Sequence, residues 1–259
     1  MQEYVLLCED STEGILTGVY EAYQFKKKMG IESHDCIHLA TEEPDIQRLF
    51  TEYEHIQTDS VNAGKVTDTI IARLGNETWY RLSMAMVSCL AEKADAVYHT
   101  IVLGLKTHDR NITDRLQEDC VQRAFKCARA SDYELSRLKQ FLRFSELQNG
   151  MLYAKINPKH HILPFLMPHF ADRLPADNFV IYDENTQTFG LHARFQKWYL
   201  MQGADFDEDK LVYSEVEEEY RNLFKKFCDS IAIEARINPK LQMNMLPLRF
   251  RPNMTEFQQ

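Results

Sequence analysis

The first 60 residues alternate between two hydrophobic periods, that of a strand and that of a helix. An apolar run over 3–10 ends in acids and predicts a strand. Apolar residues then recur at helical spacing over 11–28, with Asp10 or Ser11 available as the cap. Further strands are predicted over 34–40 and 53–59, and a short helix over 42–50. The segment 1–60 therefore predicts a small α/β unit.

From residue 59 the period is helical. Capping residues and glycine delimit successive helices over 59–75, 76–93 and 94–108. A long amphipathic helix over 113–144 follows, and we predict a break in it near Ala130 to Asp132. We expect a helical region over 61–142.

Beyond residue 144 the period changes to two. A hairpin is predicted with Gln148, Asn149 and Gly150 in its turn, because Asn-Gly tolerates the positive φ angles of a tight turn. A second hairpin over 178–195 follows a helix over 160–174. A helix over 214–237 then places an apolar stripe along one side, formed by Val216, Tyr220, Leu223, Phe227 and Ile231.

These patterns predict an α+β fold with three regions. They are the α/β unit over 1–60, the helical region over 61–142, and an antiparallel ββαββ unit with a following helix and tail over 143–259. The regions either fold separately or share one compact domain.

The composition is that of a folded protein, since 44% of its 259 residues are hydrophobic and few are glycine or proline. No apolar stretch has the length of a membrane span, and the first residues lack a positive leader. We therefore expect a cytoplasmic protein without a membrane partner. Its six scattered cysteines form no C-x-x-C pair, which favours reduced thiols over a disulfide framework or a zinc site.

The net charge of −9 argues against a nucleic-acid partner, but the charge is unevenly distributed. Residues 1–60 carry thirteen acids against four bases, and residues 205–220 carry eight against one. Residues 120–160 carry eight bases against three acids, and residues 233–259 carry four against two. This distribution predicts a basic surface on an acidic protein, unless the bases only solvate ordinary helix faces.

The stretch "NPKHH" at 157–161 has several chemical interpretations. One helix cannot bring His160, His161 and His169 together, because adjacent residues diverge by about 100°. We therefore predict no metal site. A histidine beside Lys159 could act as a base if Tyr182 or Asp183 of the second hairpin approached it, although no nucleophile accompanies it.

A nucleic-acid contact is the interpretation that needs no special chemistry. The turn offers backbone N–H groups, Lys159 and two histidines to a phosphate, next to Arg143 and Lys155 on adjoining strands. The alternative is that Asn157 and Pro158 only mark the junction between strand and helix.

The hexapeptide "AKINPK" at 154–159 returns as "ARINPK" at 235–240, and an extended segment after the second copy would put Arg249 and Arg251 on one side. Two basic segments could then hold one strand of DNA, unless the match is a coincidence. The predicted nucleic-acid-binding residues are Arg143, Lys155, Lys159, His160, His161, Arg249 and Arg251.

No cofactor is predicted. The junction near Asp10, Ser11 and Glu13 lacks both phosphate-binding glycine patterns, G-x-G-x-x-G and G-x-x-x-x-G-K-[ST]. The C-x-x-x-C-x-x-C spacing of a radical-SAM iron–sulfur site is also absent.

Three segments carry a resemblance to a known family: "CEDSTEGILTGVYEAY" near the start, the whole stretch from "FLRFSELQNG" to "TQTFGLH", and the closing "NPKLQMNMLPLRF". Together they resemble a bacterial family of uncharacterised proteins assigned to DNA metabolism. Its members are encoded beside a radical-SAM protein suspected of DNA repair, and a related domain is fused to a uracil-DNA-glycosylase-like domain. The resemblance implies DNA and a radical-SAM protein as partners, and it supplies no catalytic residue.

Three functions follow as hypotheses. The first is a DNA-binding protein of DNA metabolism that acts with the radical-SAM partner through the basic surface. The second is an enzyme acting on damaged DNA through His160 and His161. The third is a protein–protein adaptor that docks a basic partner on the acidic segment 205–220.

Overall fold

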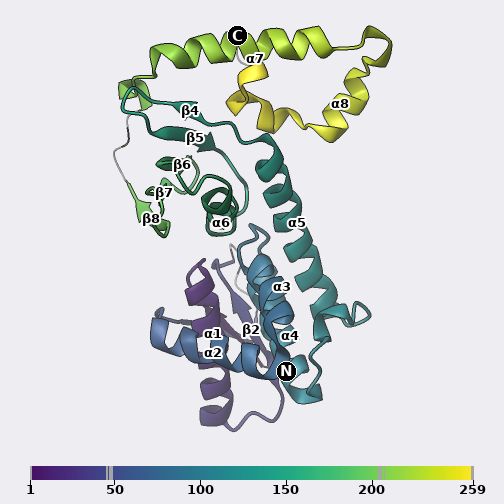
Figure 1. The fold of residues 1–259 in the computed structure, drawn as a ribbon. Helices are drawn as coiled ribbons and strands as arrows, with labels where there is room; N and C mark the ends of the chain where they lie inside the picture. The colour runs from purple at the N-terminus through teal and green to yellow at the C-terminus, as the bar shows by residue number, and fades with distance from the viewer. Residues whose placement is uncertain (1, 45, 47–48, 204–205, 207, 258–259) are drawn as a thin grey trace. The chain divides into compact units, whose positions relative to one another are not determined.

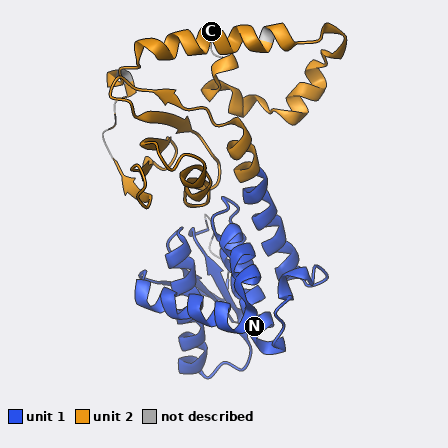
Figure 2. Cartoon of the chain, viewed as in Figure 1, with its two compact units in different colours: residues 1–133 blue, residues 134–259 orange. Residues whose placement is uncertain are grey.

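The computed structural model describes residues 2–44, 46, 49–203, 206 and 208–257. The chain divides into two compact units, Met1–Tyr133 and Glu134–Gln259 (Figure 2). Helix α5 (Asp119–Phe141) begins in the first unit and ends in the second. None of the helices within the described residues is long and apolar enough to cross a bilayer.

The first unit contains a parallel three-stranded sheet in the order β2-β1-β3. Its strands are β1 (Glu3–Leu7), β2 (Ile37–Ala40) and β3 (Thr51–His55). Helix α1 (Thr12–Met29) begins after Ser11, whose hydroxyl accepts the Gly14 N–H at 2.9 Å. The three predicted strands and the first helix are thus present, although β2 begins three residues later than predicted and β3 spans 51–55, not 53–59. The short helix predicted over 42–50 includes 45 and 47–48, which lie outside the described residues.

Helices complete this unit. They are α2 (Ser60–Leu74), α3 (Asn76–Met86), α4 (Lys93–Thr107) and the first part of α5. Helix α2 starts at the Asp59 cap and stops at Gly75, whose φ of 93° breaks the helical path. One apolar core runs from Leu6 in β1 to Cys127 in α5, so strands and helices bury the same set of side chains.

Helix α5 is continuous through Ala130 to Asp132, so the predicted break there is wrong. Ser131 is fully buried, and its hydroxyl donates a hydrogen bond of 3.4 Å to the Cys127 carbonyl one turn earlier. A mid-helix serine satisfied in this way does not interrupt the helix.

The second unit is built on a five-stranded sheet in the order β4-β5-β6-β7-β8 (Figure 1). The strands are β4 (Ser145–Glu146), β5 (Leu152–Ile156), β6 (Phe179–Asp183), β7 (Thr188–His192) and β8 (Tyr199–Gln202). Helix α6 (Leu163–Arg173) connects β5 to β6, so the α+β class and the ββαββ order are confirmed.

The prediction that this unit is antiparallel throughout is wrong for one pair. Strands β5 and β6 run parallel, whereas the other neighbouring strands are antiparallel. Helix α6 carries the chain back along the sheet, so β6 enters in the direction of β5. Met167 of α6 lies where a side chain at Gly190 of β7 would otherwise project.

Helices form the rest of the second unit: α7 (Glu215–Ile231), α8 (Pro239–Met245) and several short 3-10 helices. Arg249 and Arg251 lie on the 3-10 helix Leu248–Asn253, not on the extended segment considered for them. The side chains of this segment therefore do not alternate as those of a strand do.

Candidate functional site

The predicted phosphate-binding turn binds an anion, and that anion is a carboxylate of the same chain. The N–H groups of Lys159 and His160 both donate to Glu134 Oε2, each at 2.9 Å. Glu134 projects from α5 and its side chain is 1% exposed. Its other oxygen, Oε1, lies 2.7 Å from Arg249 Nη1 in an ion pair without hydrogen-bond geometry. Neither amide is left for an external phosphate.

The two adjacent histidines of this turn have different environments. His160 is buried, and burial lowers its pKa. Arg249 and the Lys159 side chain lower it further, against the opposing charge of Glu134. His161 is exposed, as is Lys159. The charged or titratable side chains that face solvent from this turn are therefore those of Lys159 and His161, beside the exposed Asn157.

The remaining predicted bases are paired elsewhere in the second unit. Lys155 Nζ lies 2.9 Å from Glu184 Oε1 and 2.7 Å from Glu208 Oε2. Arg143 Nη2 lies 2.8 Å from Glu256 Oε1. Arg251 Nη2 donates to the Leu246 carbonyl at 3.2 Å, and its guanidinium stacks over Phe257. The structure thus joins Lys159, His160 and Arg249 through Glu134, and it gives Arg143, Lys155 and Arg251 separate partners.

Lys155 and Arg249 also line one small cavity with Asn157. Its volume is about 20 Å³, which is roughly the space of one water molecule. This cavity cannot hold a nucleotide or a sugar.

Asp183, the carboxylate considered as a catalytic partner, closes the turn after β6. Its Oδ1 accepts the N–H of Asn185 at 3.0 Å, while Oδ2 is buried without a hydrogen bond among the described residues. Burial raises the pKa of Asp183, although hydrogen bonds from Thr186 and Asn185 and the charge of His161 act in the opposite direction. His161, one of the two predicted histidines, thus acts on Asp183 through its charge.

The two NPK copies have different roles. At the second copy, Asn238 caps α8 by accepting the Leu241 N–H at 3.0 Å, and Pro239 opens the helix. At the first copy, Asn157 instead donates to Glu184 Oε2 at 2.9 Å, in the turn that follows β5. The shared sequence does not create two equivalent basic segments.

The apolar stripe predicted on α7 is exposed to solvent. Its five residues keep between 50% and 63% of their surface accessible: Val216, Tyr220, Leu223, Phe227 and Ile231. The helix is attached to the unit by a different side. There Arg221 Nη2 donates to Ser145 Oγ at 2.6 Å, and Glu217 Oε2 accepts the Glu146 N–H at 3.0 Å.

The acids of α7 divide in the same way. Glu217 is engaged by Arg221 and Glu146, whereas Glu215, Glu218 and Glu219 are exposed in the first turns. Residues 205 and 207 of the predicted acidic segment lie outside the described residues, and Glu208 pairs with Lys155. The available part of this segment is therefore the start of α7.

Exposed apolar side chains continue after α7. They are Ile233, Ile237, Leu241, Met243, Met245 and Leu248, each at least 45% accessible. The segment 215–248 thus carries exposed apolar side chains along its length, and apolar exposure on this scale is typical of an interaction surface.

Sequence comparison supplies one positive finding. Residues 91–256 match the model of a family described as a domain of unknown function, DUF4130. No curated protein matches the chain. The matched segment begins just before α4 and includes the strands of the second unit, Glu134 and α7. Because the match spans well over half of the chain, the protein belongs to the DUF4130 family.

Proposed function

We propose that this protein acts in DNA metabolism as a docking protein, and that the exposed stripe of α7 binds a protein partner. One observation carries the proposal: the stripe has the spacing of a buried helix face, yet all five residues are at least half accessible. Complete burial of a side chain such as Leu or Phe contributes about 1.5–3 kcal/mol. A partner that covers the stripe recovers this stabilisation on binding.

The chemistry of α7 describes the partner. An amphipathic helix binds by placing its apolar residues in a hydrophobic groove. Glu215, Glu218 and Glu219 carry negative charge at the first turns, so the matching groove has basic residues at that end. We infer a protein with an apolar groove and a basic rim.

The family resemblance supports the biological setting. It implies DNA metabolism and a radical-SAM protein encoded beside this one. That radical-SAM protein is the first partner to test. In this proposal the radical-SAM protein catalyses the reaction, and the present chain positions that protein by binding it.

The experiment compares purified wild-type protein with two variants of α7 in a binding titration against the purified radical-SAM protein. Leu223→Glu/Phe227→Glu places charge in the stripe. Asn222→Glu is the matched control, because Asn222 is exposed on the opposite side of the same helix. Both variants should retain the wild-type helical circular dichroism, since their side chains are already exposed. We expect the double variant to weaken binding at least tenfold and the control to bind normally.

Other results would contradict the proposal. Equal binding by the stripe variant and the control would exclude the α7 stripe as the docking surface. Absence of any complex with the wild-type protein would exclude the radical-SAM partner. A concentration-dependent dimer that the stripe variant abolishes would assign the stripe to self-association.

A second candidate function is direct contact with nucleic acid through the turn at 157–161. The supporting observation is that the side chains of Lys159 and His161 are exposed on this turn, so they can contact a phosphate although both backbone amides already donate to Glu134. Fluorescence anisotropy with labelled single- and double-stranded DNA at two salt concentrations tests it. Salt-dependent binding that falls in Lys159→Ala/His161→Ala supports the candidate. Binding that is absent, or unchanged in this variant, refutes it.

A further inference from the structure

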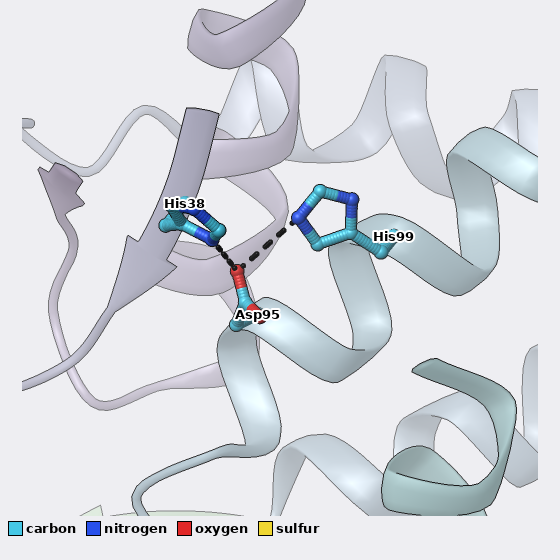
Figure 3. Close-up of side chains that lie close together, drawn as sticks. All are labelled: His38, Asp95 and His99. Atoms are coloured by element: carbon cyan, nitrogen blue, oxygen red, sulfur yellow. Dashed lines mark hydrogen bonds and ion pairs between the residues drawn. The ribbon is translucent and has the colours of Figure 1, made fainter. Parts of the chain in front are cut away.

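A cluster of two histidines and one aspartate lies in the first unit, far in sequence from the stretch in which we predicted no metal site. It consists of His38 on β2 and of Asp95 and His99 on α4 (Figure 3). Asp95 and His99 are four residues apart, so they lie on one face of the helix. Figure 3 shows the carboxylate between the two imidazole rings.

The distances within the cluster suit a metal ion. Asp95 Oδ1 lies 3.0 Å from His38 Nδ1 and 3.4 Å from His99 Nε2. When two ligand atoms bind one ion at about 2.0–2.2 Å and subtend an angle of roughly 90–110° at it, the two atoms lie roughly 3.0–3.5 Å apart. Both measured separations already lie in this range. His38 Nδ1 and His99 Nε2 lie within 4.8 Å of each other, so a small side-chain rotation brings this third distance into the same range.

The second oxygen of the carboxylate is held in place. Asp95 Oδ2 accepts from Arg123 Nη1 at 2.9 Å, which leaves Oδ1 directed at the histidines. Arg123 is itself paired with Asp119 at 2.8 Å, so its positive charge is balanced. Hydrogen bonds that orient a ligating carboxylate are a regular feature of metal sites.

The cluster is also partly open to solvent. The side chains of His38, Asp95 and His99 are 33%, 17% and 16% exposed. An ion can therefore enter and keep a water molecule as a further ligand. Without metal, two neutral imidazoles can each donate an N–H to the carboxylate. Ligation requires the lone pair of His38 Nδ1 and His99 Nε2, so the proton of each ring moves to its other nitrogen.

We propose that His38, Asp95 and His99 form a binding site for one divalent transition-metal ion. Two imidazoles and a single carboxylate select zinc, cobalt or iron over magnesium and calcium, which prefer oxygen ligands. The site rests on the first unit alone and is independent of the docking function of α7.

The test uses tag-free full-length protein dialysed against a chelator and titrated with Co²⁺, whose visible absorption reports its ligands. We expect one Co²⁺ per chain, displaced by Zn²⁺ and unaffected by excess Mg²⁺. The affinity should fall at least tenfold in Asp95→Asn and in His99→Gln. His169→Gln, which removes a half-buried histidine of the other unit, should bind as wild type.

Two results overturn the proposal. One is a wild-type protein that binds no Co²⁺ even at a large molar excess of the ion. The other is binding that both cluster variants retain. Because Asp95→Asn also removes the ion pair with Arg123, the folding of each variant is checked by circular dichroism. If neither variant folds, X-ray absorption of the zinc-loaded wild type decides: nitrogen and oxygen ligands support the site, and sulfur ligands assign the ion to cysteines.

Discussion

Replacement of Glu134 tests whether the turn at 157–161 depends on the carboxylate beneath it. In Glu134→Ala the N–H groups of Lys159 and His160 lose their acceptor. A hydrogen bond to a charged group contributes about 1.5–3 kcal/mol, so two of them predict a loss of about 3–6 kcal/mol. Arg249 is 34% exposed and can turn to water, so its ion pair adds less than about 1 kcal/mol.

Two comparisons separate this effect from general damage. Glu134→Gln keeps an oxygen for both amides and removes only the charge, and we expect a loss of about 1–2 kcal/mol. Glu184→Gln removes a more exposed carboxylate of the same unit, 44% accessible, and should cost less than about 1 kcal/mol.

The assay is urea unfolding followed by the fluorescence of Trp198 in a Trp79→Phe background. The chain has two tryptophans, one in each unit, so Trp198 reports the second unit alone. Hydrogen exchange should show the Lys159 and His160 amides protected in the wild type and unprotected in Glu134→Ala. If Glu134→Ala costs no more than Glu184→Gln and both amides stay protected, the reasoning is refuted.

Three further predictions follow from buried groups and close contacts. Burial raises the pKa of Asp183 above its ordinary value of 3.8, so the protein loses stability as the pH rises from 3.8 through the raised pKa of the folded state. Asp183→Asn should abolish this loss, measured as the difference between melting temperatures at pH 4 and pH 7. Iodoacetamide at pH 8 should modify the exposed Cys89 well before Cys8 or Cys127, whose pKa values burial raises to about 12 and about 11; mass spectrometry showing early labelling of either buried thiol contradicts this. A methyl group at Gly14 would clash with the Glu9 carbonyl oxygen, so Gly14→Ala should destabilise the protein by about 1–3 kcal/mol. Gly64→Ala, with open space in α2, should instead stabilise it by about 1 kcal/mol in thermal unfolding.

Local patterns were sufficient for most elements of the fold. The apolar period and the caps Ser11, Asp59 and Gly75 predicted the main helices of the first unit, because both signals act within one or two turns. The predicted break in α5 failed because Ser131 satisfies its hydroxyl within the helix, which composition does not reveal. The direction of β6 relative to β5 depends on where α6 packs, and no local signal states that.

The candidate sites show the same division. The sequence identified the stretch at 157–161 as anion-binding and the α7 stripe as apolar, since both properties belong to the residues themselves. It did not identify Glu134 as the bound anion, because α5 supplies it from 25 residues away. The pair Asp95 and His99 was a readable signal at i, i+4, but His38 lies 57 residues earlier and only the packing of β2 beside α4 completes the cluster.

Sequence alone thus determined most of the helix and strand segments and which faces are apolar, because backbone propensity and side-chain period are short-range properties. Tertiary structure decided which charges neutralise one another, and it left the predicted stripe of α7 in solvent. Burial and ion pairing depend on residues distant in the chain, so the role of a lysine, histidine or leucine is set by the side chains that the fold places beside it.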